Sequence, residues 1–176
     1  MDGTPIKDLL HSCLASASKL QADIRATIGP PEEGLLSESQ QVIPMSIVRN
    51  TRGYLETVAN QINGCYERAW YDGCAVMVRR LVETLIIEVF EHFSIADRIK
   101  GPSGDFLFLR DLIGKTLNET AWNLSRNTKK ALPKLKDVGD KSAHSRRYLA
   151  HRNDIDKIVD DLRVVVQELV LLAGLK

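Results

Sequence analysis

The sequence predicts an all-α protein, an up-and-down bundle of five or six helices. Apolar residues recur every three or four positions through most of the chain, and no run of strand length alternates apolar and polar residues. The chain has 176 residues, 44% of them hydrophobic, which is enough for one globular core. We divide it into an N-terminal helix with an acidic loop, residues 1–45, and a helical bundle, residues 46–176.

The first predicted helix begins at Thr4 and Pro5. The Thr4 hydroxyl can cap free backbone N–H groups, and the backbone N–H that Pro5 lacks would have no partner in the first turn of a helix. Its apolar stripe extends to Ile28, where residues 29–31, Gly-Pro-Pro, end it. An acidic segment punctuated by Pro and Gly follows as far as residue 45. We interpret this segment as a loop that separates the first helix from the bundle.

Ser46 is the predicted N-cap of a helix that continues to residue 69, because the apolar phase is unbroken through Asn63 and Gly64. Asp72 is the predicted cap of the next helix, which ends at Phe93. This helix is the most apolar in the chain, so we expect it at the centre of the bundle. We expect the aromatic residues of this part and the next to lie in the core or an interface: Trp70, Tyr71 and Trp122.

Three further helices complete the prediction. A short one opens at Asp105, and a basic one runs from Ser125 to about residue 143 with a bend or restart at Pro133. The last helix is capped by Asn153 and ended by Gly174.

Positive charge is concentrated between Arg126 and Arg152. This segment holds nine Lys or Arg against two Asp, a net charge of +7; the whole chain carries +1, which leaves −6 for the remainder. A clustered positive field is typical of proteins that bind phosphate-bearing partners, although most charge runs are simply solvated faces. We therefore predict RNA or DNA as the partner. The predicted contact residues are Arg126, Lys129, Lys130, Lys134, Arg147 and Arg152.

Several other function classes lack their signatures. The sequence has no Gly-rich phosphate loop and no nucleophile elbow, and its four histidines lack metal-ligand spacing, so we expect neither cofactor nor metal. No apolar run reaches the length of a membrane span, and the N-terminus does not resemble a signal peptide. Three widely spaced cysteines indicate reduced thiols. We expect a cytoplasmic protein without a membrane contact.

Two motifs in order suggest a family. The first is YDGCAVMVRRLVE, residues 71–83, which carries Arg79 and Glu83; the second is KDVGDKSAH, residues 136–144; a capped amphipathic helix follows. Together they resemble the HEPN-like helical domains of bacteria, in particular a subfamily of uncharacterised members. The resemblance covers residues 47–172 and leaves the first helix outside.

The resemblance implies a compact bundle that forms a homodimer, in families that include metal-independent ribonucleases of toxin and defence systems and members without known catalysis. Catalytic members share an Arg, four to six intervening residues and a His. His144 has no Arg at that spacing, and Lys136 lies one residue too far away. Arg146 and His151 do have the required spacing, but about one such pair is expected by chance in a sequence of this composition.

The residues around His144 could still form a ribonuclease site. Asp140 lies one helical turn earlier and could orient the imidazole, while Lys136 or Lys141 could supply positive charge. The alternative pair is Arg146 with His151. The interpretation favoured for His144 is structural: it would fill the space where the basic helix meets the bundle, because its small neighbour Ala143 suggests close helix packing. His151 fits a surface position beside the last helix.

Arg79 and Glu83, four residues apart on the central helix, are predicted to form an ion pair within the bundle or at a dimer contact. The leading hypothesis is a HEPN-like nucleic-acid-associated regulatory or defence module whose catalysis is absent or residual. The alternatives are a metal-independent endoribonuclease and a protein-binding helical adaptor with an acidic partner.

Overall fold

The computed structural model describes residue 11, residues 13–20 and residues 41–176. The chain forms two compact units, Met1–Ser37 and Glu38–Lys176. In the first unit, residues 11 and 13–20 are helical. The remainder of the first predicted helix, and the predicted loop up to residue 40, lie outside the described residues.

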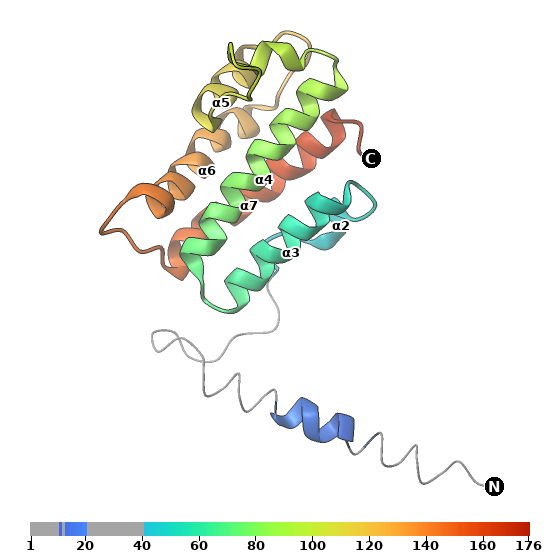
Figure 1. The fold of residues 1–176 in the computed structure, drawn as a ribbon, viewed down its shortest axis with the longest axis vertical. Coiled ribbons are helices and arrows are strands. Elements are labelled where there is room, and N and C mark those ends of the chain that lie inside the picture. The colour runs from blue at the N-terminus through green and yellow to red at the C-terminus, as the bar shows by residue number, and fades with distance from the viewer. Residues whose placement is uncertain (1–10, 12, 21–40) are drawn as a thin grey trace, which may run out of the picture. The chain divides into compact units, whose positions relative to one another are not determined.

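The second unit is a bundle of helices (Figure 1), so the all-α prediction is confirmed. Within residues 41–176 there is no β-strand, and the one isolated bridge joins Lys100 to Phe106. No helix in the described part of the chain combines the length and apolar character needed to span a membrane. The elements are α2 (Met45–Val48), α3 (Gly53–Glu67), α4 (Tyr71–His92), the 3-10 turn η1 (Ala96–Ile99), α5 (Leu109–Asn118), α6 (Arg126–His144) and α7 (Arg152–Leu172).

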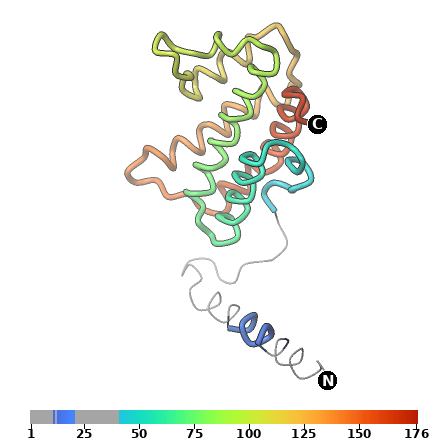
Figure 2. The backbone as a smooth tube through the Cα atoms, turned by 45° about the vertical axis from the view of Figure 1, so that its right-hand side comes forward, coloured from blue at the N-terminus to red at the C-terminus, as the bar shows by residue number. Residues whose placement is uncertain are grey.

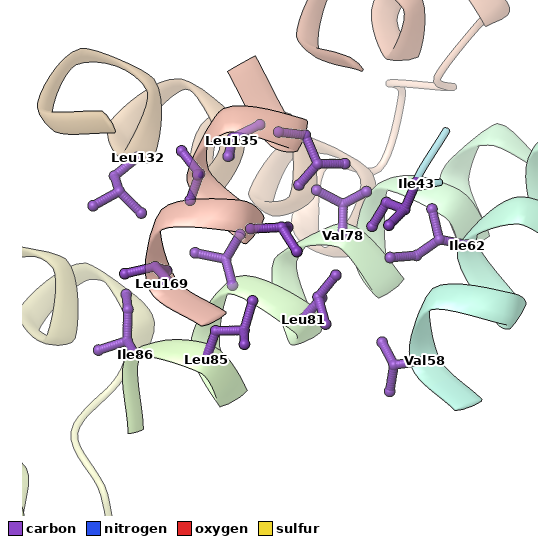
Figure 3. Close-up of a cluster of buried hydrophobic side chains, with 14 of the residues drawn as sticks. Ile43, Val58, Ile62, Val78, Leu81, Leu85, Ile86, Leu132, Leu135 and Leu169 are labelled. Carbon is purple, nitrogen blue, oxygen red and sulfur yellow. The ribbon is translucent and has the colours of Figure 1, made fainter. Parts of the chain in front are cut away.

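Helix α4 occupies the centre of the bundle, as its apolar composition predicts. It packs against α3, α6 and α7 along its length and against α5 and η1 near its C-terminal end. Figure 3 shows Leu81 and Leu85 of α4 in the same buried cluster as Leu135 of α6 and Leu169 of α7. These side chains are fully buried, so hydrophobic contacts between α4, α6 and α7 form a large part of the core.

The predicted helix over residues 46–69 is in fact two helices. α2 ends at Val48, and Asn50 adopts a left-handed conformation with φ of 65°, which asparagine tolerates better than most residues. The Asn50 N–H donates to Glu56 Oε1 at 2.8 Å, which fixes the turn before α3. Ser46 lies inside α2 and makes no cap, so that prediction is wrong.

Residues 41–45 belong to the bundle. Asn63 is buried inside α3, where its side chain accepts from the Ile43 N–H at 2.9 Å and donates to the Ile43 carbonyl at 2.8 Å. Both polar groups of Ile43 are thereby satisfied next to the core. The structural division after Ser37 therefore falls earlier than the sequence-based division after residue 45.

The predicted start of α5 at Asp105 is wrong, because the helix begins at Leu109 with Phe108 as N-cap. The preceding residues form a tight turn, in which Leu107 N–H donates to the Ile99 carbonyl at 2.9 Å. Asp72 lies in the first turn of α4 and makes no cap; it accepts instead from the Ala150 N–H at 3.0 Å.

The last helix also begins before its predicted cap. His151 is the N-cap of α7, and its backbone N–H donates to Asp154 Oδ2 at 3.1 Å. Asn153 lies in the first turn. The predicted end is right: Gly174 follows the helix with φ of +61°, a conformation that favours glycine.

The aromatic residues divide between core and surface. Trp122 is buried against the rings of Phe90 and Phe93, and Tyr71 is buried against Tyr66. Trp70, by contrast, is 59% exposed at the turn before α4, so it does not belong to the core of the chain.

Candidate nucleic-acid interface

Helix α6 carries most of the basic segment, and its two faces have different roles. Ser125 caps it by accepting from the Thr128 N–H at 3.2 Å, and the helix continues through Pro133 to His144. The buried residues recur every three or four positions and pack towards α4 and α7. They are Thr128, Ala131, Leu132, Leu135 and Gly139.

The N-terminal end of α6 is fastened to α7 by Glu168. This carboxylate accepts from the Ser125 N–H and hydroxyl, each at 2.6 Å, and from the Thr128 hydroxyl. Burial alone would raise the pKa of Glu168, but these hydrogen bonds outweigh it and lower the pKa. The carboxylate therefore stays ionised and holds the basic helix in position.

The outward face of α6 presents the cations. Arg126, Lys130 and Lys134 follow one another at four-residue intervals and so lie in a row on one side of the helix, all exposed. Lys141 continues this row one turn beyond Asp137. From Arg126 to Lys141 this row extends over about 22 Å, at a rise of about 1.5 Å per residue.

Two of the predicted contact residues, Lys134 and Arg152, and the predicted catalytic Lys136 are already paired within the bundle. Lys134 Nζ lies 2.9 Å from Asp161 Oδ2, and Lys136 Nζ lies 2.6 Å from Asp140 Oδ2 with the side chain only 18% exposed. Arg152 Nε donates to the Tyr66 hydroxyl at 3.2 Å and lies near Asp156. These three cations are poorly placed to contact an external phosphate.

Six cations remain available, and we call them the open cations. Each is exposed and has no carboxylate within ion-pairing distance among the described residues. Five of them make no side-chain hydrogen bond in that part of the chain, and the sixth, Lys129, contacts only Asn123 Oδ1 at 3.4 Å. The open cations are Arg126, Lys129, Lys130, Lys141, Arg146 and Arg147.

Arg146 and Arg147 lie on the connection between α6 and α7. The residues that follow them on this connection are fixed by hydrogen bonds. Tyr148 donates its hydroxyl to Asp154, and the Ala150 N–H is bonded to Asp72. Burial raises the pKa of the Tyr148 hydroxyl, which keeps this donor protonated. The two arginines therefore project from an anchored loop, so less conformational freedom is lost when they bind an anion.

Arg79 and Glu83 form the predicted ion pair, with Arg79 Nη1 3.1 Å from Glu83 Oε2. The structure adds a partner that spacing did not predict: Arg79 Nε lies 2.9 Å from Asp140 Oδ1. Asp140 thus bridges Arg79 on α4 and Lys136 on α6. Burial alone would raise the pKa of Asp140, yet hydrogen bonds from Lys136 and Arg79 lower it.

This bridge changes the assignment of the predicted catalytic residues. Both Asp140 oxygens are engaged by Arg79 and Lys136, and no hydrogen bond between Asp140 and His144 occurs in the described residues. His144 is exposed in the last turn of α6. The predicted close packing beside Ala143 is wrong, because Ala143 is exposed as well.

Gly139 lies at a close approach of α6 to α4, a feature that sequence analysis missed. A Cβ placed on Gly139 would lie 2.6 Å from Arg79 Cβ and 3.1 Å from the Ala75 carbonyl oxygen. Only glycine fits at this crossing. The glycine between two aspartates was visible in the sequence, but the crossing partner was not.

The second predicted pair is also not assembled. His151 caps α7 and is exposed, while Arg146 lies in the loop before it, and no hydrogen bond between them occurs in the described part of the chain. Groups of three or more His, Cys, Asp or Glu that could hold a metal ion are not found among the described residues. The assembled feature is therefore the row of exposed cations on α6.

The Asp140 bridge leads to a prediction about stability. We expect Asp140→Asn to lower the free energy of unfolding at pH 7 by about 1–2 kcal/mol, between the values for surface and buried pairs. Because the folded-state pKa of Asp140 is lowered, its contribution is present above the unfolded-state pKa and is lost as pH falls through the folded-state value. Urea unfolding between pH 7 and pH 3 should show the two proteins converging in acid.

Asp137→Asn is the matched control, since Asp137 lies on the same helix with a mostly exposed side chain and contacts Lys136 at 3.4 Å. It should change stability by less than about 0.5 kcal/mol. Equal effects of the two substitutions, or a difference that does not shrink as pH falls below the ordinary pKa of an aspartate, would contradict the assigned role of Asp140.

Comparison with protein-family models, curated proteins and solved structures finds no match to this chain. The HEPN-like resemblance thus stays a prediction that rests on the two sequence motifs.

Proposed function

We propose that this chain is a HEPN-like nucleic-acid-associated regulatory or defence module of the cytoplasm. It binds RNA or DNA through the open cations, and its catalysis is absent or residual. The observation that carries the proposal is the set of exposed, unpaired cations on α6 and the α6–α7 connection. The homodimer and the regulatory or defence role come from the resemblance alone.

The electrostatics favour a polyanion over a small ligand. The open cations extend along the whole of α6 and onto the loop after it, and they do not converge on one point. A small anion would contact only one or two of them. A nucleic-acid backbone presents phosphates at regular intervals and can neutralise the full row.

Binding by wild-type protein should weaken steeply with salt. If all six open cations contact phosphates, log K against log salt concentration should have a slope of about −4 for a single strand, because each contact releases about 0.7 counterion. Fluorescence anisotropy with labelled RNA and DNA measures this slope. A slope near zero would contradict the proposal and favour the protein-binding adaptor.

The same samples, incubated in chelator, test the ribonuclease alternative. Cleavage that leaves a 2′,3′-cyclic phosphate and is lost in His144→Ala or His151→Ala would make the protein an enzyme. Both histidines are exposed, so neither substitution should unfold the chain. Salt-sensitive binding without cleavage is the expected result.

A further inference from the structure

The segment between η1 and α5 carries two exposed phenylalanines. Phe106 is 40% exposed and Phe108 is 81% exposed. Soluble proteins expose few large aromatic side chains side by side, and such patches commonly mark contact sites.

The backbone explains why both rings point outward. Phe106 pairs with Lys100 in the isolated bridge, and Phe108 is extended with φ of −63° and ψ of 152°. Successive side chains of an extended segment alternate between faces, and here Leu107 packs on the core and Leu109 is fully buried. Phe106 and Phe108 therefore share the solvent-facing side.

Cations flank the two rings. Lys100 Nζ lies 5.9 Å from the centre of the Phe106 ring and 3.2 Å from Asp97 Oδ1. The Arg110 side chain, 81% exposed, follows Phe108 by two residues and lies 3.4 Å from Asp111 Oδ1, so both cations form only surface ion pairs, which are weak. Aromatic rings interleaved with basic residues are the arrangement on which single-stranded nucleic acids stack their bases. Trp70, Tyr71 and Trp122, the aromatic residues considered from sequence, do not form such a platform.

The aromatic segment and the open cations belong to adjoining parts of the bundle. α5, which starts directly after Phe108, packs against α6. Figures 1 and 2 both place the yellow-green segment before α5 at the opposite end of the bundle from the orange α6–α7 connection. The row of open cations on α6 lies between these two ends.

We propose that Phe106 and Phe108 form a base-stacking platform that makes this chain selective for single-stranded nucleic acid. The inference rests on the proposed function and refines its substrate class. A single strand can hold its phosphates on the open cations while unpaired bases stack on the two rings. Bases of a duplex are already stacked on their neighbours and leave no free face for Phe108.

The test compares a labelled single strand and a duplex of the same sequence by fluorescence anisotropy. Phe108→Ala should weaken single-strand binding about 10-fold and leave duplex affinity unchanged. Its salt slope should equal that of wild type, since no phosphate contact is removed. Phe108→Tyr should retain binding and Phe108→Leu should not, because stacking requires an aromatic ring. Trp70→Ala, which removes another exposed aromatic residue with a cation over its ring, is the matched control and should have no effect.

Unchanged single-strand affinity in Phe108→Ala, or an equal loss for single strand and duplex, would overturn the platform. If the protein still binds with a steep salt slope, either result contradicts the stacking platform but not the proposed function. The aromatic pair would then be a protein contact. If wild-type protein shows no salt-dependent binding to either probe, the proposed function and the platform both fall.

Discussion

Replacing four open cations, Lys130, Lys141, Arg146 and Arg147, with alanine is expected to weaken nucleic-acid binding roughly 100-fold or more at 0.1 M salt. Each phosphate contact that is lost removes about 0.7 released counterion, which is about fivefold in affinity at that concentration. The salt slope should fall from about −4 to between −1 and −2, as measured by anisotropy titrations at several salt concentrations.

Matched single variants test whether the position of a charge matters. Arg147→Ala removes an open cation, whereas Arg49→Ala removes an exposed arginine between α2 and α3, helices that do not pack against α6. For a single strand, the first should reduce the magnitude of the slope by about 0.7 and the second should leave it unchanged. Similar effects of both would mean that net charge, and not the face of α6, governs binding.

Substituting alanine at Gly139 is expected to destabilise the protein, although alanine is the better helix former. The added Cβ would lie 2.6 Å from Arg79 Cβ, and neither that atom nor the Ala75 carbonyl can rotate away. Overpacking of this kind costs about 1–3 kcal/mol, against a helix-propensity gain of about 1 kcal/mol. Urea unfolding should therefore give a net loss of up to about 2 kcal/mol.

The same substitution at Gly114, Gly114→Ala, is expected to stabilise the protein. Gly114 lies inside α5 with no atom within 4 Å of an added Cβ, so the substitution should gain about 1 kcal/mol. A stabilising effect at Gly139 of the same size would show that α6 and α4 do not cross as closely as the structure indicates.

The periodicity of apolar residues was sufficient to predict most of the helices and to predict which face of each helix is buried. The three- and four-residue spacing along α6 separates its buried face from its basic face without reference to any other helix, and the cap at Ser125 and the end at Gly174 depend only on neighbouring residues. The all-α fold and the central place of α4 follow from the same local pattern.

The predicted first residues of α5 and α7 were wrong, because contacts with residues distant in the sequence help to place these helix starts. The residues before α5 look helical by periodicity, yet they form a turn because Leu107 bonds to Ile99 and packs on the core. α7 begins at Arg152 next to a loop whose Ala150 N–H is bonded to Asp72 on α4. A hydrogen bond across 78 residues leaves no periodic signal in either segment.

Sequence alone therefore determined that positive charge gathers on one helix and the loop after it, since that charge is local. Only tertiary structure decided that Lys134 is paired, because the Asp161 carboxylate comes from another helix. Lys136 and Arg152, by contrast, pair with carboxylates four residues along their own helices. Tertiary structure also decided that Gly139 lies at a helix crossing and that Phe108 faces solvent. Ion pairing, close packing and exposure are properties of residues brought together by folding, so a one-dimensional pattern does not contain them.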